Sequence, residues 1–110
     1  MNDEYKKQIM QRLAKNLLDI QLLRLIGSQP TWGYKIKKDF EAELELKLRH
    51  GALYPTLNAM EAKGFVESQR VQKSGRARKV YTLTAKGKEF LKEYNAVLRE
   101  QLKKNQAHSG

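Results

Sequence analysis

The amino-acid sequence predicts a mainly α-helical domain with one small β-hairpin, an α+β fold. Apolar residues recur at helical spacing over most of the chain, and one segment around a glycine turn alternates as strands do. The length of 110 residues allows one modest hydrophobic core but not two. We therefore expect a single folded unit.

The overall charge is strongly positive. The sequence has 22 Lys and Arg against 12 Asp and Glu, a formal net charge of +10. Such an excess predicts a polyanionic partner, a nucleic acid before an anionic membrane. Charge alone does not separate nucleic-acid binders from other small basic proteins.

Several classes of protein are excluded by what the sequence does not contain. The chain has no cysteine, so it forms no disulfide bond, thiolate metal site or cysteine nucleophile. No apolar run reaches the roughly 20 residues of a membrane span, and the first residues do not resemble a secretory leader. We expect a cytoplasmic, nucleoid-associated protein without membrane contact.

A first helix is expected from about residue 8 to residue 26, after a polar and frayed start at residues 1–7. The second half of this helix is apolar on nearly every side. Such a helix must be covered on every side, and one small domain covers only part of it. The uncovered remainder suggests a partner chain.

Two short features flank a second predicted helix. Residues 27–30 read as a turn, and Thr31 is a candidate N-cap for the helix that follows. After that helix, Leu44–Leu48 alternates strictly, which predicts a short strand paired with the later hairpin. Within the helix itself, we favour packing over DNA contact for Trp32 and Tyr34.

The segment from Arg49 to Gly64 is the helix on which the functional interpretation depends. Leu53, Leu57 and Met60 lie at i, i+4 and i+7, so they share one buried face. A solvated face usually carries Lys and Glu, but the opposite face here is small and nearly uncharged, which predicts close approach of a partner. That face consists of Gly51, Pro55, Asn58, Ala59 and Ala62. Gly64 stands where a left-handed cap would end the helix.

Two strands are predicted next, residues 65–71 and 78–83, joined by a turn at residues 73–76. From Ser68 to Lys88 the sequence has no acidic residue. A cationic hairpin tip with glycine suits contact with phosphates or the minor groove. The alternative is an edge hairpin that its charge protects from aggregation, which the lack of interleaved Glu disfavours.

A last helix is predicted over residues 85–104, capped by Thr84, with a disordered tail at residues 105–110. Gly87 in its first turn would permit close packing. Its apolar stripe extends beyond the domain of residues 1–84, so we expect it to pack with the first helix across a two-fold axis of a homodimer. The predicted dimer contacts are Ile9, Leu13, Leu17, Leu91, Tyr94, Leu98 and Leu102.

Three motifs, in register and in the same order, resemble those of PadR-type winged-helix transcriptional regulators. They are Gly33-Tyr34-Lys-Ile36, Leu53-Tyr54-Pro55 followed by Met60-Glu-Ala-Lys-Gly-Phe-Val, and Arg78-Lys-Val-Tyr81-Thr-Leu83-Thr84-Ala-Lys-Gly87. The resemblance covers about residues 8–104. It implies a winged helix-turn-helix with an added C-terminal dimerisation helix, and transcriptional repression from a pseudo-palindromic operator. Two recognition helices would then lie about 34 Å apart on the DNA.

The expected DNA contacts divide by type. Asn58 can read adenine in bidentate fashion, and Tyr54 is a groove residue that can also be partly core. The full groove set is His50, Gly51, Tyr54, Pro55 and Asn58. The expected phosphate contacts are Arg49 and Lys63 on this helix, Lys73, Arg76, Arg78 and Lys79 on the wing, and Lys35 and Lys38 on the second helix. For the last two, plain solvation is an equal alternative.

The resemblance also implies that a small aromatic or drug-like effector can relieve repression. The sequence gives this little support. Trp32, the only tryptophan, lies outside the dimer helices. Phe90 and Tyr94 belong to the apolar stripe of the last helix, where aromatic residues are usually core.

The sequence argues against an enzyme. Its two histidines, His50 and His108, have no credible partner, and no carboxylate pair or metal-ligand set is evident. We expect no catalytic residue, metal or cofactor. The main alternative is a nonspecific architectural DNA-binding protein, from which a regulator would differ by a preference of at least roughly 10³ for its site. A protein-interaction module is a third interpretation, but it would not need a cationic wing.

Overall fold

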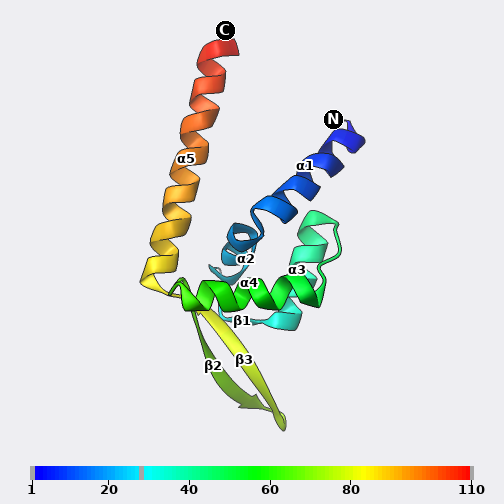
Figure 1. The fold of residues 1–110 in the computed structure, drawn as a ribbon, viewed down its shortest axis with the longest axis vertical. Coiled ribbons are helices and arrows are strands. Elements are labelled where there is room, and N and C mark those ends of the chain that lie inside the picture. Colours follow the sequence, from blue (N-terminus) through cyan, green and yellow to red (C-terminus); the bar gives the residue numbers. More distant parts are fainter. Residues whose placement is uncertain (1, 28, 110) are drawn as a thin grey trace.

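The computed structural model describes residues 2–27 and 29–109, except the side chains of Lys73 and of residues 105–109. That part contains five helices and three strands. Their bounds are α1 Asp3–Asn16, α2 Leu18–Gly27, β1 Thr31–Trp32, α3 Gly33–Leu44, α4 His50–Ala62, β2 Val66–Lys73, β3 Arg76–Leu83 and α5 Ala85–Ser109. Helices α2 to α4 form a body from which α5 and the β2–β3 hairpin project in opposite directions (Figure 1). This is the predicted α+β, winged helix-turn-helix fold, and we call the hairpin the wing.

The single first helix predicted over residues 8–26 is wrong, because α1 and α2 are separate helices. The chain leaves helical geometry at Leu17, where φ is −126° and ψ is 36°. The frayed start predicted for residues 1–7 is also wrong from Asp3 onward. The Asn2 side chain accepts hydrogen bonds from two backbone amides of the first turn, at 2.9 and 3.2 Å, and so caps α1.

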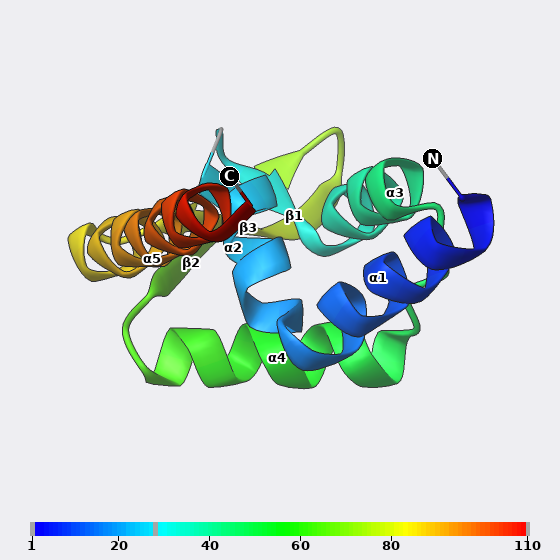
Figure 2. The same cartoon turned by 90° about the horizontal axis from the view of Figure 1, so that it is seen from above.

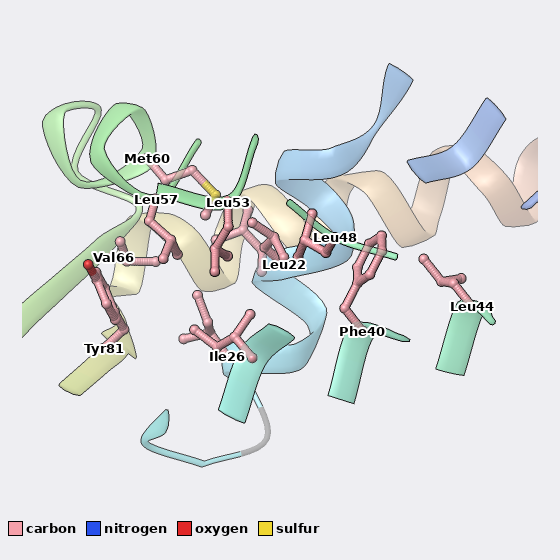
Figure 3. Close-up of a cluster of buried hydrophobic side chains, with 12 residues drawn as sticks. Leu22, Ile26, Phe40, Leu44, Leu48, Leu53, Leu57, Met60, Val66 and Tyr81 are labelled. Carbon is pink, nitrogen blue, oxygen red and sulfur yellow. The ribbon is translucent and has the colours of Figure 1, made fainter. Parts of the chain in front are cut away.

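Helix α2 lies at the centre of the hydrophobic core (Figure 3). Leu22, Leu23 and Ile26 are at most 1% exposed because α3, α4, α5 and β3 all pack against α2. The chain itself therefore covers this helix, and the partner inferred there from its all-round apolar character is not needed. The rest of the core comes from the neighbouring elements: Ile36, Phe40, Leu44, Leu48, Leu53, Leu57, Met60, Val66 and Tyr81.

The loop between α3 and α4 replaces the strand predicted at Leu44–Leu48. Helix α3 continues to Leu44 and ends at Glu45, which adopts a left-handed conformation with φ of 56°. The Leu48 amide donates a hydrogen bond of 2.7 Å to the Glu41 carboxylate, which holds the loop against α3. The alternation of leucines therefore reflects the end of α3 and the loop after it, which bury Leu44 and Leu48 respectively in the core, and not a strand.

The sheet takes its third strand from β1 instead. The strands are antiparallel in the order β1-β3-β2, and Thr31 and Trp32 lie opposite Tyr81 and Val80 of β3. Thr31 is therefore buried in the sheet and is not the N-cap of α3. Trp32 occupies the cap position without a side-chain hydrogen bond.

The wing has the predicted architecture, with strands slightly longer than expected. β2 and β3 pair along their whole lengths. The turn consists of Ser74 and Gly75, both with positive φ, 54° and 77°. Two such residues match the twist of paired strands, so the hairpin is regular up to its tip.

Helix α5 begins as predicted and ends later. The Thr84 hydroxyl accepts a hydrogen bond of 3.0 Å from the Gly87 amide, which confirms Thr84 as the cap. The helix continues beyond Lys104 to Ser109, so residues 105–109 extend α5 where a disordered tail was predicted. Figures 1 and 2 show α1 and α5 rising from the body as two diverging arms. Within the described ranges, no helix is long and apolar enough to cross a membrane.

Candidate nucleic-acid interface

Helix α4 has the two faces that its sequence predicts. Leu53, Leu57 and Met60 are at most 2% exposed and pack into the core. The helix lies along one edge of the body (Figure 2), and every residue of the opposite face is exposed: Gly51, Pro55, Asn58, Ala59 and Ala62. A Cβ built on Gly51 would meet no atom within 4 Å. A binding partner can therefore approach the backbone of α4 closely on this face.

The start of α4 carries a pair of stacked rings. His50 and Tyr54 lie 5.7 Å apart between ring centroids, with 15° between their planes. Tyr54 is 39% exposed, and a Cβ on Gly33 would lie 2.6 Å from its hydroxyl oxygen. Tyr54 is thus partly core and partly surface, as the sequence predicted, because one side of its ring packs on the start of α3 and the other side is exposed. The exposed Arg49 precedes them as the N-cap residue, without a side-chain cap hydrogen bond.

The end of α4 is held by a cation from α5. The Lys86 ammonium donates a hydrogen bond of 2.8 Å to the carbonyl of Lys63, where it compensates the negative end of the helix dipole. Gly64 follows with φ of 81°, the predicted left-handed residue. The Lys63 side chain itself is exposed.

The basic residues of the wing differ in their surroundings. Arg76 is exposed near the tip, and in the described part of the chain its side chain makes no hydrogen bond or ion pair. Arg78 places its guanidinium carbon 4.4 Å from the ring centre of Trp32. Lys79 forms an ion pair of 3.3 Å with Glu61 of α4. The predicted side-chain role of Lys73 lies outside the described atoms.

The segment from Ser68 to Lys88 has no acidic residue of its own, but Glu61 of α4 supplies one to the wing. The sequence does not reveal this contact, because it joins two different elements. Glu61 also accepts a hydrogen bond of 2.5 Å from the Ser68 hydroxyl of β2. That hydrogen bond, followed by the contact with Lys79, lowers the pKa of Glu61 below its ordinary value. The pKa of Lys79 is raised, first by the adjacent Tyr81 and then by Glu61.

The two lysines of α3 that were predicted to contact phosphate each lie against another side chain of the same helix. Lys35 pairs with Asp39 at 2.7 Å, and the Lys38 ammonium lies 5.3 Å from the ring centre of Tyr34. Tyr34 is 62% exposed, so the packing predicted for it is wrong. Trp32 is half-buried under Arg78, in line with packing. The exposed aromatic ring of Tyr34 is a surface feature that the sequence interpretation missed.

An open cleft of about 420 Å³ lies between α4, the start of α3 and the wing. Five predicted site residues line it: Tyr54, Asn58, Arg76, Arg78 and Lys79. Helix and wing thus bring two side chains predicted to read the groove and three cationic side chains to one hollow. The other predicted α4 and α3 residues, Arg49, His50, Gly51, Pro55, Lys63, Lys35 and Lys38, do not line this cleft.

The apolar residues predicted at a dimer interface lie on the two diverging arms. Ile9 on α1 is 57% exposed, and Leu98 and Leu102 on α5 are 40% and 61% exposed. Two further exposed apolar residues of the arms, Tyr5 and Val97, were not in the predicted set. The other predicted contacts are half-buried: Leu13, Leu17, Leu91 and Tyr94.

Comparison with known proteins identifies the family. Residues 22–93 match the family described as the transcriptional regulator PadR-like family. The crystal structure of a PadR family transcription regulator from Clostridium difficile R20291 is 32% identical, with a TM-score of 0.74 over 84% of this chain and 97% of that one. Bacillus subtilis PadR, solved in complex with operator DNA, is 28% identical, with a TM-score of 0.66 over 71% of this chain and 46% of its own.

A shorter match agrees with these structures. The transcriptional regulator Rv3488 of Mycobacterium tuberculosis is 44% identical over 50 residues. The match covers 46% of this chain and 47% of that protein, so it spans about half the length of the curated relative. The motif order, the winged-helix fold and the family match agree, and the chain belongs to the PadR-like family of transcriptional regulators.

Proposed function

We propose that the protein is a sequence-specific DNA-binding transcriptional repressor that binds a pseudo-palindromic operator as a homodimer. One observation carries the proposal: the exposed, short-chain face of α4 borders a cleft lined by Arg76, Arg78 and Lys79. A face without long side chains suits the major groove, and cations beside it suit the phosphates. The operator complex of Bacillus subtilis PadR supports this proposal.

The proposal divides the work between two kinds of residue. Asn58 of α4, with His50, Gly51, Tyr54 and Pro55, reads base edges. Arg76 and Arg78 of the wing, with Arg49 and Lys63 at the two ends of α4, bind phosphates and supply affinity for any sequence. Relief by an aromatic effector, which the family resemblance implies, stays a prediction without support from the described contacts.

Binding of purified protein to the DNA upstream of its own gene tests the first claim, with footprinting to find the site. A repressor of this kind prefers its operator over random duplex by at least about 10³ at physiological salt. A protein that coats both duplexes equally would instead be an architectural DNA-binding protein. Repression itself is tested by a reporter gene placed behind the footprinted site.

Two substitutions test the division of labour. We expect Asn58→Ala to weaken operator binding by about 1–3 kcal/mol and to leave the salt dependence unchanged. We expect Arg76→Gln to weaken operator and random duplex alike and to reduce the slope of log K against log salt by about one unit. Fluorescence anisotropy at several salt concentrations measures both quantities.

Arg12→Gln is the matched control for Arg76→Gln. It removes the same charge from an exposed position on α1, outside the proposed DNA interface. The control should leave the salt slope close to that of the unchanged protein. Equal effects of Asn58→Ala and Arg76→Gln on operator and random DNA would refute the proposed division.

A further inference from the structure

Glu61 joins the recognition helix α4 to both strands of the wing. Its two carboxylate oxygens are used separately: Oε2 accepts from the Ser68 hydroxyl of β2 at 2.5 Å, and Oε1 lies 3.3 Å from the Lys79 ammonium of β3. The Lys79 ammonium in turn lies 5.6 Å from the ring centre of Tyr81, which is 2% exposed. One acid side chain thus connects α4, β2 and β3 next to the core.

The position of this contact along the wing matters. Ser68 lies in the half of the hairpin nearest the body, and Lys79, which pairs with Arg70, lies just beyond it, whereas Arg76 and the turn form the far end. The wing projects from the body as a two-stranded arm (Figure 1). A two-stranded hairpin is only marginally stable by itself, so contacts at its base govern its direction. Small changes in angle there become large displacements of Arg76.

The charge of Glu61 is unexpected for a surface that faces a polyanion. A carboxylate beside DNA phosphates weakens binding through repulsion. Glu61 is ionised at neutral pH, because the ordinary pKa of a glutamate lies well below 7 and the hydrogen bond from Ser68 lowers it further. Electrostatics alone would therefore favour a neutral residue at this position.

We propose that Glu61 is a positioning residue that fixes the angle between the wing and α4, and that Lys79 serves this contact instead of binding phosphate. The inference rests on the proposed DNA-binding function and refines it. Base reading by Asn58 and phosphate binding by Arg76 must occur on one duplex together, so the angle between their elements affects specific binding. Nonspecific binding needs no such register.

Glu61→Gln separates this proposal from simple electrostatics because the two predict opposite signs. Without positioning, the loss of a negative charge and the release of Lys79 strengthen binding to every duplex and steepen the salt dependence. With positioning, Glu61→Gln weakens operator binding about fivefold or more, within the range for coupled contacts, while random duplex binds no more weakly than before.

Glu67→Gln is the matched control. Glu67 is an exposed acid one residue before Ser68 on β2, and among the described residues it has no ion pair. Its neutralisation makes the same change in net charge and should strengthen operator and random duplex alike. An effect of Glu61→Gln equal in sign and size to that of Glu67→Gln would overturn the proposal.

The exchange Glu61→Lys/Lys79→Glu gives a second test that keeps the net charge. The exchanged pair can form the same ion pair in reverse, so we expect it to regain most of the operator affinity that either single change loses. If the exchange binds operator as weakly as Glu61→Gln, the contact between these two charges does not set the specificity.

A readout without DNA tests the angle itself. The natural chain has no cysteine, so spin labels at Ala62→Cys and Gln72→Cys report one distance between α4 and the wing. Labelled protein is diluted into unlabelled protein to remove distances between subunits. We expect a narrow distribution of label-to-label distances when Glu61 is unchanged, with or without Glu67→Gln, and a broad distribution for Glu61→Gln.

An unchanged distribution in Glu61→Gln would also overturn the proposal. This readout remains decisive if the protein prefers no duplex at all. In that case the proposed function fails, while the distance distribution still decides whether Glu61 fixes the wing.

Discussion

Gly87 illustrates how a single position joins two elements. A Cβ built there would lie 2.0 Å from the carbonyl oxygen of Phe65. That same carbonyl accepts a hydrogen bond of 3.1 Å from the Thr84 amide, and the Phe65 ring stacks on Phe90 at 4.6 Å between centroids. The first turn of α5 therefore rests directly on the backbone that enters β2, which only a residue without a side chain permits.

Substitution of Gly87 tests this contact. Alanine in a helix is favoured over glycine by up to about 1 kcal/mol, but here its methyl group would overlap backbone. We expect Gly87→Ala to lower the free energy of unfolding by about 1–3 kcal/mol, the usual cost of overpacking. Urea unfolding followed by circular dichroism measures the change.

Gly51→Ala provides the comparison for this measurement. Both glycines lie in the first turn of a helix, but nothing lies within 4 Å of a Cβ at Gly51. We expect no loss of stability there. A Gly87→Ala protein as stable as Gly51→Ala would show that the contact with Phe65 relaxes without cost.

At the scale of the element, α4 contains a proline past its first turn. Pro55 has no amide to donate to the carbonyl of Gly51, four residues earlier. Gly51 is exposed, so water can satisfy that carbonyl and the helix continues. The next residue adds a local hydrogen bond: the Thr56 hydroxyl donates to the carbonyl of Ala52 at 2.8 Å. The helix tolerates Pro55 on its outer face, but nothing in its own packing requires it.

We therefore expect Pro55→Ala to stabilise the fold. The gain should not exceed the roughly 3 kcal/mol that proline costs in a helix interior, and thermal or urea unfolding measures it. Anisotropy with the operator then asks whether the stabler helix still binds. A loss of stability in Pro55→Ala would mean that the ring makes contacts that outweigh the missing hydrogen bond.

At the scale of the molecule, the chain is elongated, with extents of 59, 31 and 20 Å. The two arms and the wing account for this shape (Figure 1). Apolar residues on the arms remain exposed, Ile9, Val97 and Leu102 each by more than half. Exposed apolar surface on two projecting helices is typical of an association surface. A two-fold pairing of the arms would cover it and would leave both α4 helices available to DNA.

We expect size-exclusion chromatography with light scattering to give twice the mass of the 12.8 kDa chain at micromolar concentration. The double change Leu98→Glu/Leu102→Glu places charge on the exposed stripe and should give the monomer. Gln101→Glu adds a charge one residue away, at another angle around α5, and should leave the dimer intact. A stable monomer of the unchanged chain would contradict the proposed homodimer.

Sequence patterns alone predicted the elements that depend on neighbours in the chain. The spacing of Leu53, Leu57 and Met60 gave the buried face of α4, because helical periodicity is a local property. Gly75 predicted the turn of the wing, and Thr84 predicted the cap of α5, because turn and cap chemistry involve only a few successive residues. Two of the three family motifs lie in or next to these segments, and the third, Gly33–Ile36, lies at the start of α3.

Tertiary structure decided what depends on residues distant in sequence. The break at Leu17, the third strand at Thr31–Trp32 and the inward-facing loop after α3 all follow from how the elements share one core. The contact of Glu61 with Lys79 has no signature in the sequence, because an ion pair between two elements depends on where the fold brings them. Local chemistry determined the elements whose signals lie within a few successive residues, and the packing of the core around α2 determined the remaining boundaries and which side chains meet.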